Sequence, residues 1–171
     1  MSLPEPQWTR GLPKKFVCGV ATLGPLGTRL PAPGTWGSLA GLLYFSIFFL
    51  HSRWEVIFAW SVLASLVAVV FCGDAARRIG REDPGEVILD EFVVMPLVFL
   101  GWRVGAGAHW PEWTVLLAGF ALFRFYDILK PLGIARLQRL PGGWGIVIDD
   151  VAAALAACAT LHLGAWIWAL R

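Results

Sequence analysis

Charged residues are scarce in this chain. Asp, Glu, Lys and Arg together make up 15% of its 171 residues, whereas a soluble domain has roughly 25%. Hydrophobic residues make up 57%, and the mean hydropathy is +0.66. This shortage of charge excludes an ordinary soluble domain and predicts a protein whose solvent is largely the lipid bilayer.

Cysteine and net charge are also low, and each shortage excludes a class of protein. The three cysteines, Cys18, Cys72 and Cys158, are too few and too widely spaced for a disulfide framework or a CxxC metal site. A net charge of +2 is too weak for a nucleic-acid-binding surface, so we expect no nucleic-acid partner. The stretch 1–15 lacks an apolar run directly after its charges, so we expect no cleaved signal peptide.

Five apolar segments predict an all-α, polytopic membrane protein built as one domain over residues 1–171. Three of the segments approach the roughly 20 residues that a membrane-spanning helix needs; they cover about 54–73, 112–129 and 150–170. The two shorter ones cover about 36–50 and 91–104. Pro96 interrupts the second of these, and both are expected to cross a thinned bilayer or to be re-entrant.

The basic residues are distributed unevenly between the connections. If all five segments cross the membrane, eleven of the 14 Lys and Arg residues fall on one side. The positive-inside rule then places this side in the cytoplasm and the C-terminus outside. The ten tryptophans fit a belt at the membrane interfaces.

Pairs of acidic residues open two of the apolar segments. Asp90-Glu91 precede one, and Asp149-Asp150 follow the glycine-rich stretch 141–145 and precede the other. Each pair has a simpler interpretation, as an N-cap with a favourable first-turn acid. Two acids in a row exceed what a cap needs, and unpaired carboxylates beside apolar sequence are costly. The pairs therefore favour ligands for a hard divalent cation.

Further polar residues fall on the same expected face. Arg124, Asp127 and Lys130 are spaced to share one helix face, and Pro131 ends that helix. An intrahelical Arg124–Asp127 pair is the simpler interpretation, but Lys130 is well placed to bind phosphate. Thr35 and Ser38 lie at the start of the first apolar segment. Two interpretations remain: either residue is an ordinary helix cap, or the helix start binds an anion.

Cys72 and Arg78 formally match the C-x5-R pattern of cysteine phosphatases. That pattern needs a strand, a loop and a helix around a reactive thiolate. Here the cysteine ends an apolar helix, so we expect no phosphocysteine chemistry.

Four motifs taken together resemble the phosphatidylglycerophosphatase A family. They are PGTWGSLAG (33–41), LDEFVVMP (89–96), FRFYDILKP (123–131) and GGWGIVIDD (142–150). The resemblance covers most of the chain and implies a magnesium-dependent phosphatase of the bacterial inner membrane. The implied reaction removes the terminal phosphate of phosphatidylglycerophosphate at the cytoplasmic face. The family motif often reads KPxPI, whereas Gly133 stands here in place of the second proline, which predicts a looser loop.

The expected mechanism is metal-assisted hydrolysis of a phosphomonoester. The candidate Mg²⁺ ligands are Asp90, Glu91, Asp127, Asp149 and Asp150. The candidate phosphate-binding residues are Thr35, Ser38, Arg124 and Lys130, and the candidate catalytic residues are Asp127, Lys130 and Asp150. One of the carboxylates is expected to act as general base; Asp127 is one candidate, and the sequence does not choose between them. The alternatives are a small cation transporter or channel with a carboxylate-lined ion site, and a non-catalytic assembly factor.

Overall fold

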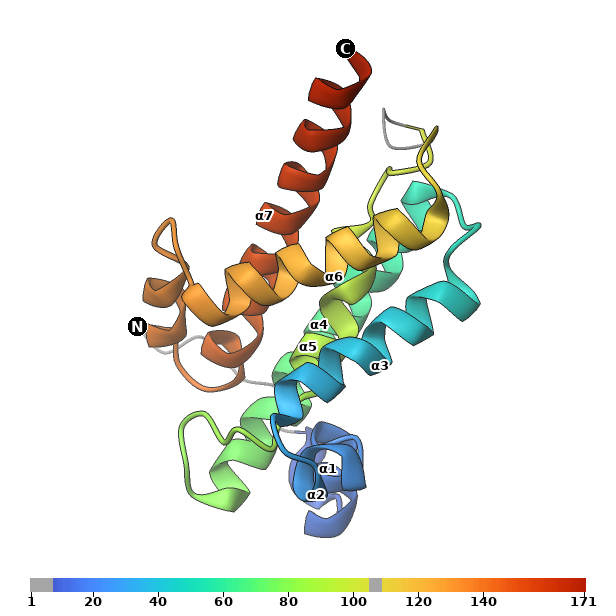
Figure 1. Ribbon diagram of the computed structural model, residues 1–171. Helices are drawn as coiled ribbons and strands as arrows, with labels where there is room; N and C mark the ends of the chain where they lie inside the picture. The colour runs from blue at the N-terminus through green and yellow to red at the C-terminus, as the bar shows by residue number, and fades with distance from the viewer. Residues whose placement is uncertain (1–7, 105–108) are drawn as a thin grey trace.

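The computed structural model describes residues 8–104 and 109–171, and over these residues every regular element is helical (Figure 1). Residues 1–7, which belong to the N-terminal stretch considered for a signal peptide, lie outside the described residues, as do residues 105–108. The prediction of an all-α protein is confirmed for the part of the chain that is described.

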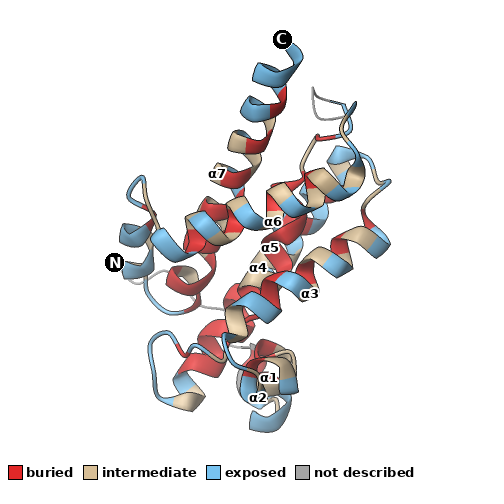
Figure 2. Ribbon diagram, in the orientation of Figure 1, coloured by how far each residue is buried: buried red, intermediate tan, exposed pale blue. Residues whose placement is uncertain are grey.

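Five main helices correspond to the five apolar segments. They are α3 (Pro33–Phe48), α4 (Trp54–Ile79), α5 (Leu89–Val98), α6 (Glu112–Leu129) and α7 (Gly143–Ala169). The short helix α5 lies at the centre and packs against α3, α4 and α7, while α6 packs mainly against α7 (Figure 1). Most of α5 is buried (Figure 2). Around it, Phe45 and Phe99 stack with ring centroids 4.5 Å apart.

Two helices, α4 and α7, are long and apolar enough to cross a membrane. The third long segment that we expected to span, α6, has 18 residues but includes Glu112, Arg124 and Asp127. The outside of the bundle is also apolar, with side chains such as Leu43 and Leu63 exposed. A large exposed apolar surface fits contact with lipid rather than water.

The predicted start of the last helix was wrong. We expected it at residue 150 with an aspartate as its cap, but α7 begins at Gly143 with Gly142 as N-cap, so both aspartates lie in its second turn. A Cβ atom on Gly143 would lie 1.8 Å from the Val69 carbonyl oxygen. The glycines that suggested a loop therefore belong to a helix that packs closely against α4.

Two other boundaries differ from the expectation. Helix α3 begins at Pro33 with Ala32 as N-cap, so Thr35 and Ser38 lie within its first turns and neither caps it. Helix α4 continues to Ile79 instead of ending near residue 73. The three charged residues that it adds, Asp74, Arg77 and Arg78, form ion pairs with one another, which lets a polar sequence remain helical.

The N-terminal part of the described chain forms three short helices. They are η1 (Trp8–Gly11), α1 (Lys14–Ala21) and α2 (Pro25–Arg29). Arg78 of α4 holds η1 against the bundle, because its guanidinium donates to the carbonyl oxygens of Thr9 and Leu12, each at 2.9 Å. Helix α1 packs against α4, and α2 packs against α3. A further 3-10 helix, η3 (Ile134–Arg139), lies between α6 and α7.

Candidate metal and phosphate site

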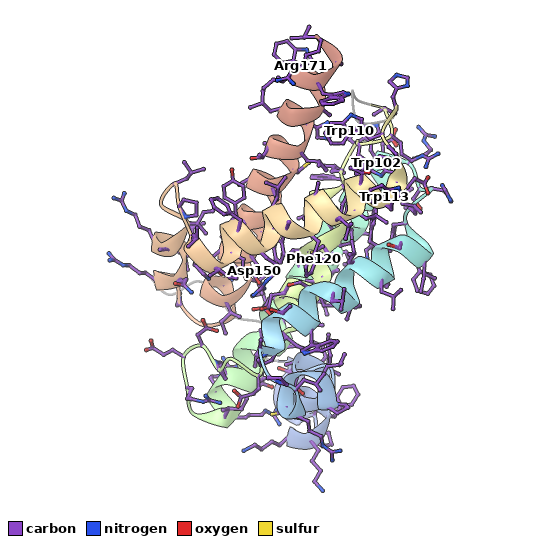
Figure 3. The ribbon with its side chains drawn as sticks, in the orientation of Figure 1. Trp102, Trp110, Trp113, Phe120, Asp150 and Arg171 are labelled. Carbon is purple, nitrogen blue, oxygen red and sulfur yellow. The ribbon has the colours of Figure 1, made fainter. Side chains whose placement is uncertain are left out.

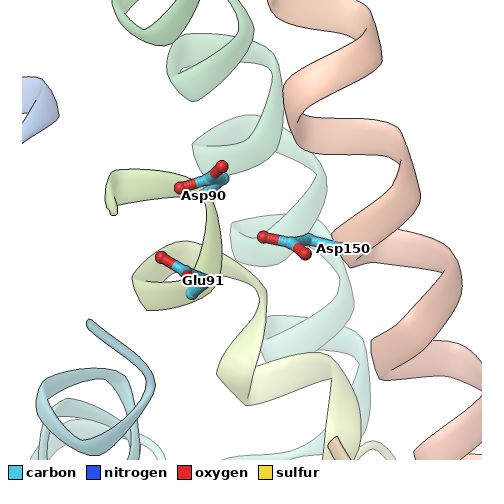
Figure 4. Close-up of side chains that lie close together, drawn as sticks. All are labelled: Asp90, Glu91 and Asp150. Carbon is cyan, nitrogen blue, oxygen red and sulfur yellow. The ribbon is translucent and has the colours of Figure 1, made fainter. Parts of the chain in front are cut away.

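Three carboxylates from two helices meet beside the centre of the bundle. Asp90 and Glu91 lie in the first turn of α5, and Asp150 lies in the second turn of α7. One oxygen atom from each lies within 4.8 Å of the others, and Figure 4 shows the three side chains turned toward one another. We call these three residues the acid cluster.

The second aspartate of the α7 pair has a different partner. Asp149 accepts a hydrogen bond from the Lys130 ammonium, which also lies 3.8 Å from an oxygen of Asp127. Lys130 is held at this place because it caps the end of α6 in a left-handed conformation (φ 44°), directly before Pro131. The predicted end of this helix is therefore confirmed.

The environment of Lys130 favours its protonated form. Partial burial opposes the charge, but the hydrogen bond to Asp149 and the negative charges of Asp149, Asp150 and Asp127 outweigh it and raise the pKa of Lys130. A lysine in this position keeps its positive charge through the neutral pH range. It can therefore act as a fixed cation next to the acid cluster.

A second cation, Arg124, lies near Glu91. Its guanidinium donates to Asp127 at 2.7 Å and to the Ser38 hydroxyl at 3.1 Å, and it lies 3.7 Å from a Glu91 oxygen. Ser38 in turn donates to the Gly34 carbonyl at 2.8 Å. The Arg124–Asp127 pair expected from the sequence is present, and it extends through Ser38 to the start of α3.

Thr35 takes no part in this network. It is exposed on the first turn of α3, and its side chain makes no hydrogen bond to the described residues. Of the two hydroxyl residues predicted to bind phosphate, only Ser38 contacts the other site residues.

Two glycines allow the start of α3 to lie directly against Glu91. A Cβ atom on Gly34 would lie 2.1 Å from one Glu91 oxygen, and one on Gly37 would lie 3.1 Å from the other. The Gly37 position also lies against Ile88, with only 2.9 Å to its side chain and to its carbonyl oxygen. These glycines in the 33–41 motif therefore make room for the site.

The acidic oxygens fit a hard cation. Asp90, Glu91 and Asp149 each have one buried oxygen with no hydrogen-bond partner among the described residues. Orphaned buried oxygens are rare and indicate a missing partner such as an ion. Mg²⁺ takes about six oxygen ligands and usually combines a few carboxylates with water or phosphate. The cluster, with Asp127 and Asp149 close by, supplies the oxygen donors that such an ion needs.

Sequence reasoning missed one acidic residue near the site. Asp83, in the loop before α5, lies close enough to act electrostatically on Asp90, Glu91 and Asp149. The signal available was the neighbouring Pro84, which starts a turn closed by the Val87 N–H donating to its carbonyl oxygen at 2.8 Å. Pro84 is fully buried, and it holds the exposed Asp83 next to the core.

The C-x5-R pattern does not form a phosphate-binding loop. Cys72 is buried within α4, and Arg78, on the same helix, is paired with Asp74 at 2.9 Å. The backbone N–H groups between them lie within the helix instead of surrounding an anion. The expectation that this pattern has no catalytic loop agrees with the geometry.

Comparison with known proteins gives one consistent family. The profile of the family described as phosphatidylglycerophosphatase A matches residues 19–165. A protein of that name from Haemophilus influenzae is 39% identical over 74% of this chain and 75% of its own length. One from Escherichia coli is 31% identical over 81% of this chain and 77% of its own length.

A third relative has a different name. A putative phosphatidylinositol-3-phosphatase from Bacteroides thetaiotaomicron is 34% identical over 80% of this chain and 85% of its own length. No solved structure matches the chain.

Proposed function

The chain belongs to the phosphatidylglycerophosphatase A family and is a lipid phosphomonoester phosphatase, and from this premise we propose that it hydrolyses phosphatidylglycerophosphate to phosphatidylglycerol with Mg²⁺. The observation that carries the proposal is the convergence of Asp90, Glu91 and Asp150 next to two fixed cations. Carboxylates alone would repel a phosphate. With a cation between them, and with Lys130 and Arg124 beside them, the site suits a phosphate dianion.

We assign the roles of the chain's own residues as follows. The acid cluster and Asp149 are the proposed holders of Mg²⁺, with Asp127 at its edge. A bound Mg²⁺ would supply positive charge to the phosphate oxygens and make a water molecule more acidic. Lys130 and Arg124 offset the remaining charge of the phosphate.

Ser38 orients Arg124 toward the site through the hydrogen bond between them. For Thr35, which is exposed, a role in phosphate binding stays a prediction.

Hydrolysis adds water across the bond between phosphorus and the glycerol oxygen. The water oxygen bonds to phosphorus, the glycerol oxygen leaves, and it takes up a proton. We propose that Asp127 or Asp150 accepts the proton that water loses, because both carboxylates lie at the site and neither is exposed. Lys130 holds Asp127 and Asp149 in place through its ion pairs.

For the membrane we propose five crossings in the bacterial inner membrane, with the acid cluster at the cytoplasmic face. The proposal rests on the apolar helices α4 and α7 and on the uneven distribution of basic residues. In Figure 3, Trp102, Trp110 and Trp113 gather at the end of the bundle away from Asp150, where a second interface would lie. The substrate's acyl chains would then remain in the bilayer while its headgroup reaches the site.

The alternative of a small cation transporter or channel finds no support in the comparisons, which match phosphatases. The name of the Bacteroides thetaiotaomicron relative suggests a second lipid substrate. We favour phosphatidylglycerophosphate, because the family profile and two relatives agree on it.

Phosphate release from phosphatidylglycerophosphate by the purified protein in detergent tests the function. With Mg²⁺ present we expect hydrolysis, which EDTA abolishes. Asp150→Asn should lower the rate about 10²–10³-fold, as loss of one preorganised electrostatic group commonly does. Cys72→Ser should retain most of the activity, because Cys72 is buried in a helix and forms no catalytic loop.

Glu112→Gln serves as the matched control, because Glu112 lies partly exposed at the opposite end of α6 and pairs with Arg103. An enzyme that resists EDTA and is inactivated by Cys72→Ser would overturn the metal mechanism. A protein with no phosphatase activity in Mg²⁺ would overturn the function.

A further inference from the structure

A cavity of about 640 Å³ at the start of α7 is not used by the mechanism above, and no residue of the acid cluster lines it. It is lined by the end of α4, the loop that follows it, the end of η3 and the start of α7, and it is open on one side. Ligand pockets usually have a volume of about 300–1,000 Å³, so this cavity is large enough for a polar headgroup or a hydrated anion.

The cavity reaches toward the acidic residues along α7. Gly145 and Ile146 line it, and they precede Asp149 and Asp150 by one helical turn on the same face. Asp83 lines it as well, and its charge acts on Asp90 and Asp149. The cavity and the acid cluster are therefore neighbours on one side of the bundle.

Three arginines line this cavity: Arg77, Arg81 and Arg139. Arg77 lies 3.4 Å from Asp74, and Arg81 is paired with Glu86. Arg139 is exposed and makes no ion pair with any described residue. Guanidinium groups bind phosphate oxygens through two parallel hydrogen bonds, so Arg139 is the group best placed to hold a phosphate here.

Acidic residues at the wall limit what the cavity can bind. Glu82 and Asp83 line it together with the arginines, so its surface is mixed rather than uniformly basic. Asp83 acts electrostatically on Asp90 of the acid cluster, whereas Arg139 belongs to η3. The lining carries three arginines against two acidic residues, so its net charge is positive and suits an anion.

We propose that this cavity is a second phosphate subsite next to the acid cluster, with Arg139 as its principal contact. The inference rests on the proposed function, because phosphatidylglycerophosphate carries a phosphodiester in addition to the terminal phosphate that is removed. Two sources of phosphate share this chemistry: the phosphodiester of the bound lipid, and the free phosphate that leaves after hydrolysis. Both need a cationic contact within reach of the reaction centre.

Steady-state kinetics of Arg139→Glu test the subsite. Two quantities are measured: kcat/KM for phosphatidylglycerophosphate relative to phosphatidic acid, which has no phosphodiester, and the inhibition constant of inorganic phosphate. We expect at least one of them to change about tenfold or more, as is common when a charged hydrogen bond is lost. A reduced preference for phosphatidylglycerophosphate identifies the phosphodiester, and weaker inhibition at unchanged preference identifies the free phosphate.

Arg136→Glu is the matched control, since Arg136 is an exposed arginine on the same short helix but does not line the cavity. Arg139→Lys keeps the positive charge, so both quantities should change less in this variant than in Arg139→Glu. If Arg139→Glu changes both quantities no more than Arg136→Glu does, the subsite does not exist. Failure of the proposed function is a separate result, because the unaltered protein would then release no phosphate from phosphatidylglycerophosphate.

Discussion

At the scale of single residues, Gly34 shows how the backbone of one helix determines the position of a carboxylate on another. A Cβ atom on Gly34 would lie 2.1 Å from a Glu91 oxygen, so Gly34→Ala must displace the Glu91 side chain. The atom displaced is the end of a flexible side chain, so we expect the protein to fold normally. We expect the Mg²⁺ concentration for half-maximal activity to rise about 10–100-fold, as when a group that orients a metal ligand is changed.

The control for this substitution is Gly19→Ala in α1, where an added Cβ meets nothing within 4 Å. Magnesium titrations of both variants give the comparison. Unchanged magnesium dependence in Gly34→Ala, with Gly19→Ala also unchanged, would remove Glu91 from the proposed set of ligands.

At the scale of elements, the contact between α4 and α7 determines where Asp149 and Asp150 lie. A Cβ atom on Gly143 would lie 1.8 Å from the Val69 carbonyl oxygen and 2.9 Å from the Gly73 nitrogen. Backbone atoms cannot move aside as a side-chain end can, so Gly143→Ala must separate the two helices. We expect a loss of stability of about 1–3 kcal/mol, typical of overpacking. It would be measured as a lower unfolding temperature in detergent.

Gly164→Ala provides the comparison on the same helix, because a Cβ at Gly164 meets nothing within 4 Å. This substitution should leave the unfolding temperature unchanged or slightly higher, because alanine has a higher helix propensity than glycine. Equal unfolding temperatures for the two variants would mean that α4 and α7 are not in close contact at Gly143.

At the scale of the whole molecule, the five-crossing proposal can be tested by topology. Reporter fusions after residues 52 and 171 should indicate the outside, and one after residue 82 should indicate the cytoplasm. The physical reason is the positive-inside rule, since eleven of the 14 basic residues lie on the side that contains residue 82.

A C-terminal reporter found in the cytoplasm would mean that either the orientation or the number of crossings is wrong. With the N-terminus in the cytoplasm, it would mean an even number of crossings. In that case α3 or α5, the two short helices of 16 and 10 residues, would be re-entrant. The fusion after residue 52 would then distinguish between them, because it directly follows α3.

The sequence alone determined the helical class and much of the acidic site. Apolar segments long enough for helices leave little room for other structure in a bilayer, and α6 begins and ends where its pattern predicted, at Glu112 and Leu129. Asp90 and Glu91 were recognisable because paired carboxylates beside apolar sequence need a counter-charge. These are local signals, since composition, proline and charge act within a few residues of where they occur.

Only the tertiary structure decided which of these residues meet. Asp150 faces the α5 pair while Asp149 faces Lys130, and no spacing along the chain distinguishes the two aspartates. The start of α7 at Gly143 and the role of Gly34 depend on backbone approach between helices. The position of Asp83 depends on the burial of the adjacent Pro84. Contacts between residues far apart in the chain arise from packing, and a single sequence carries no local signal of them.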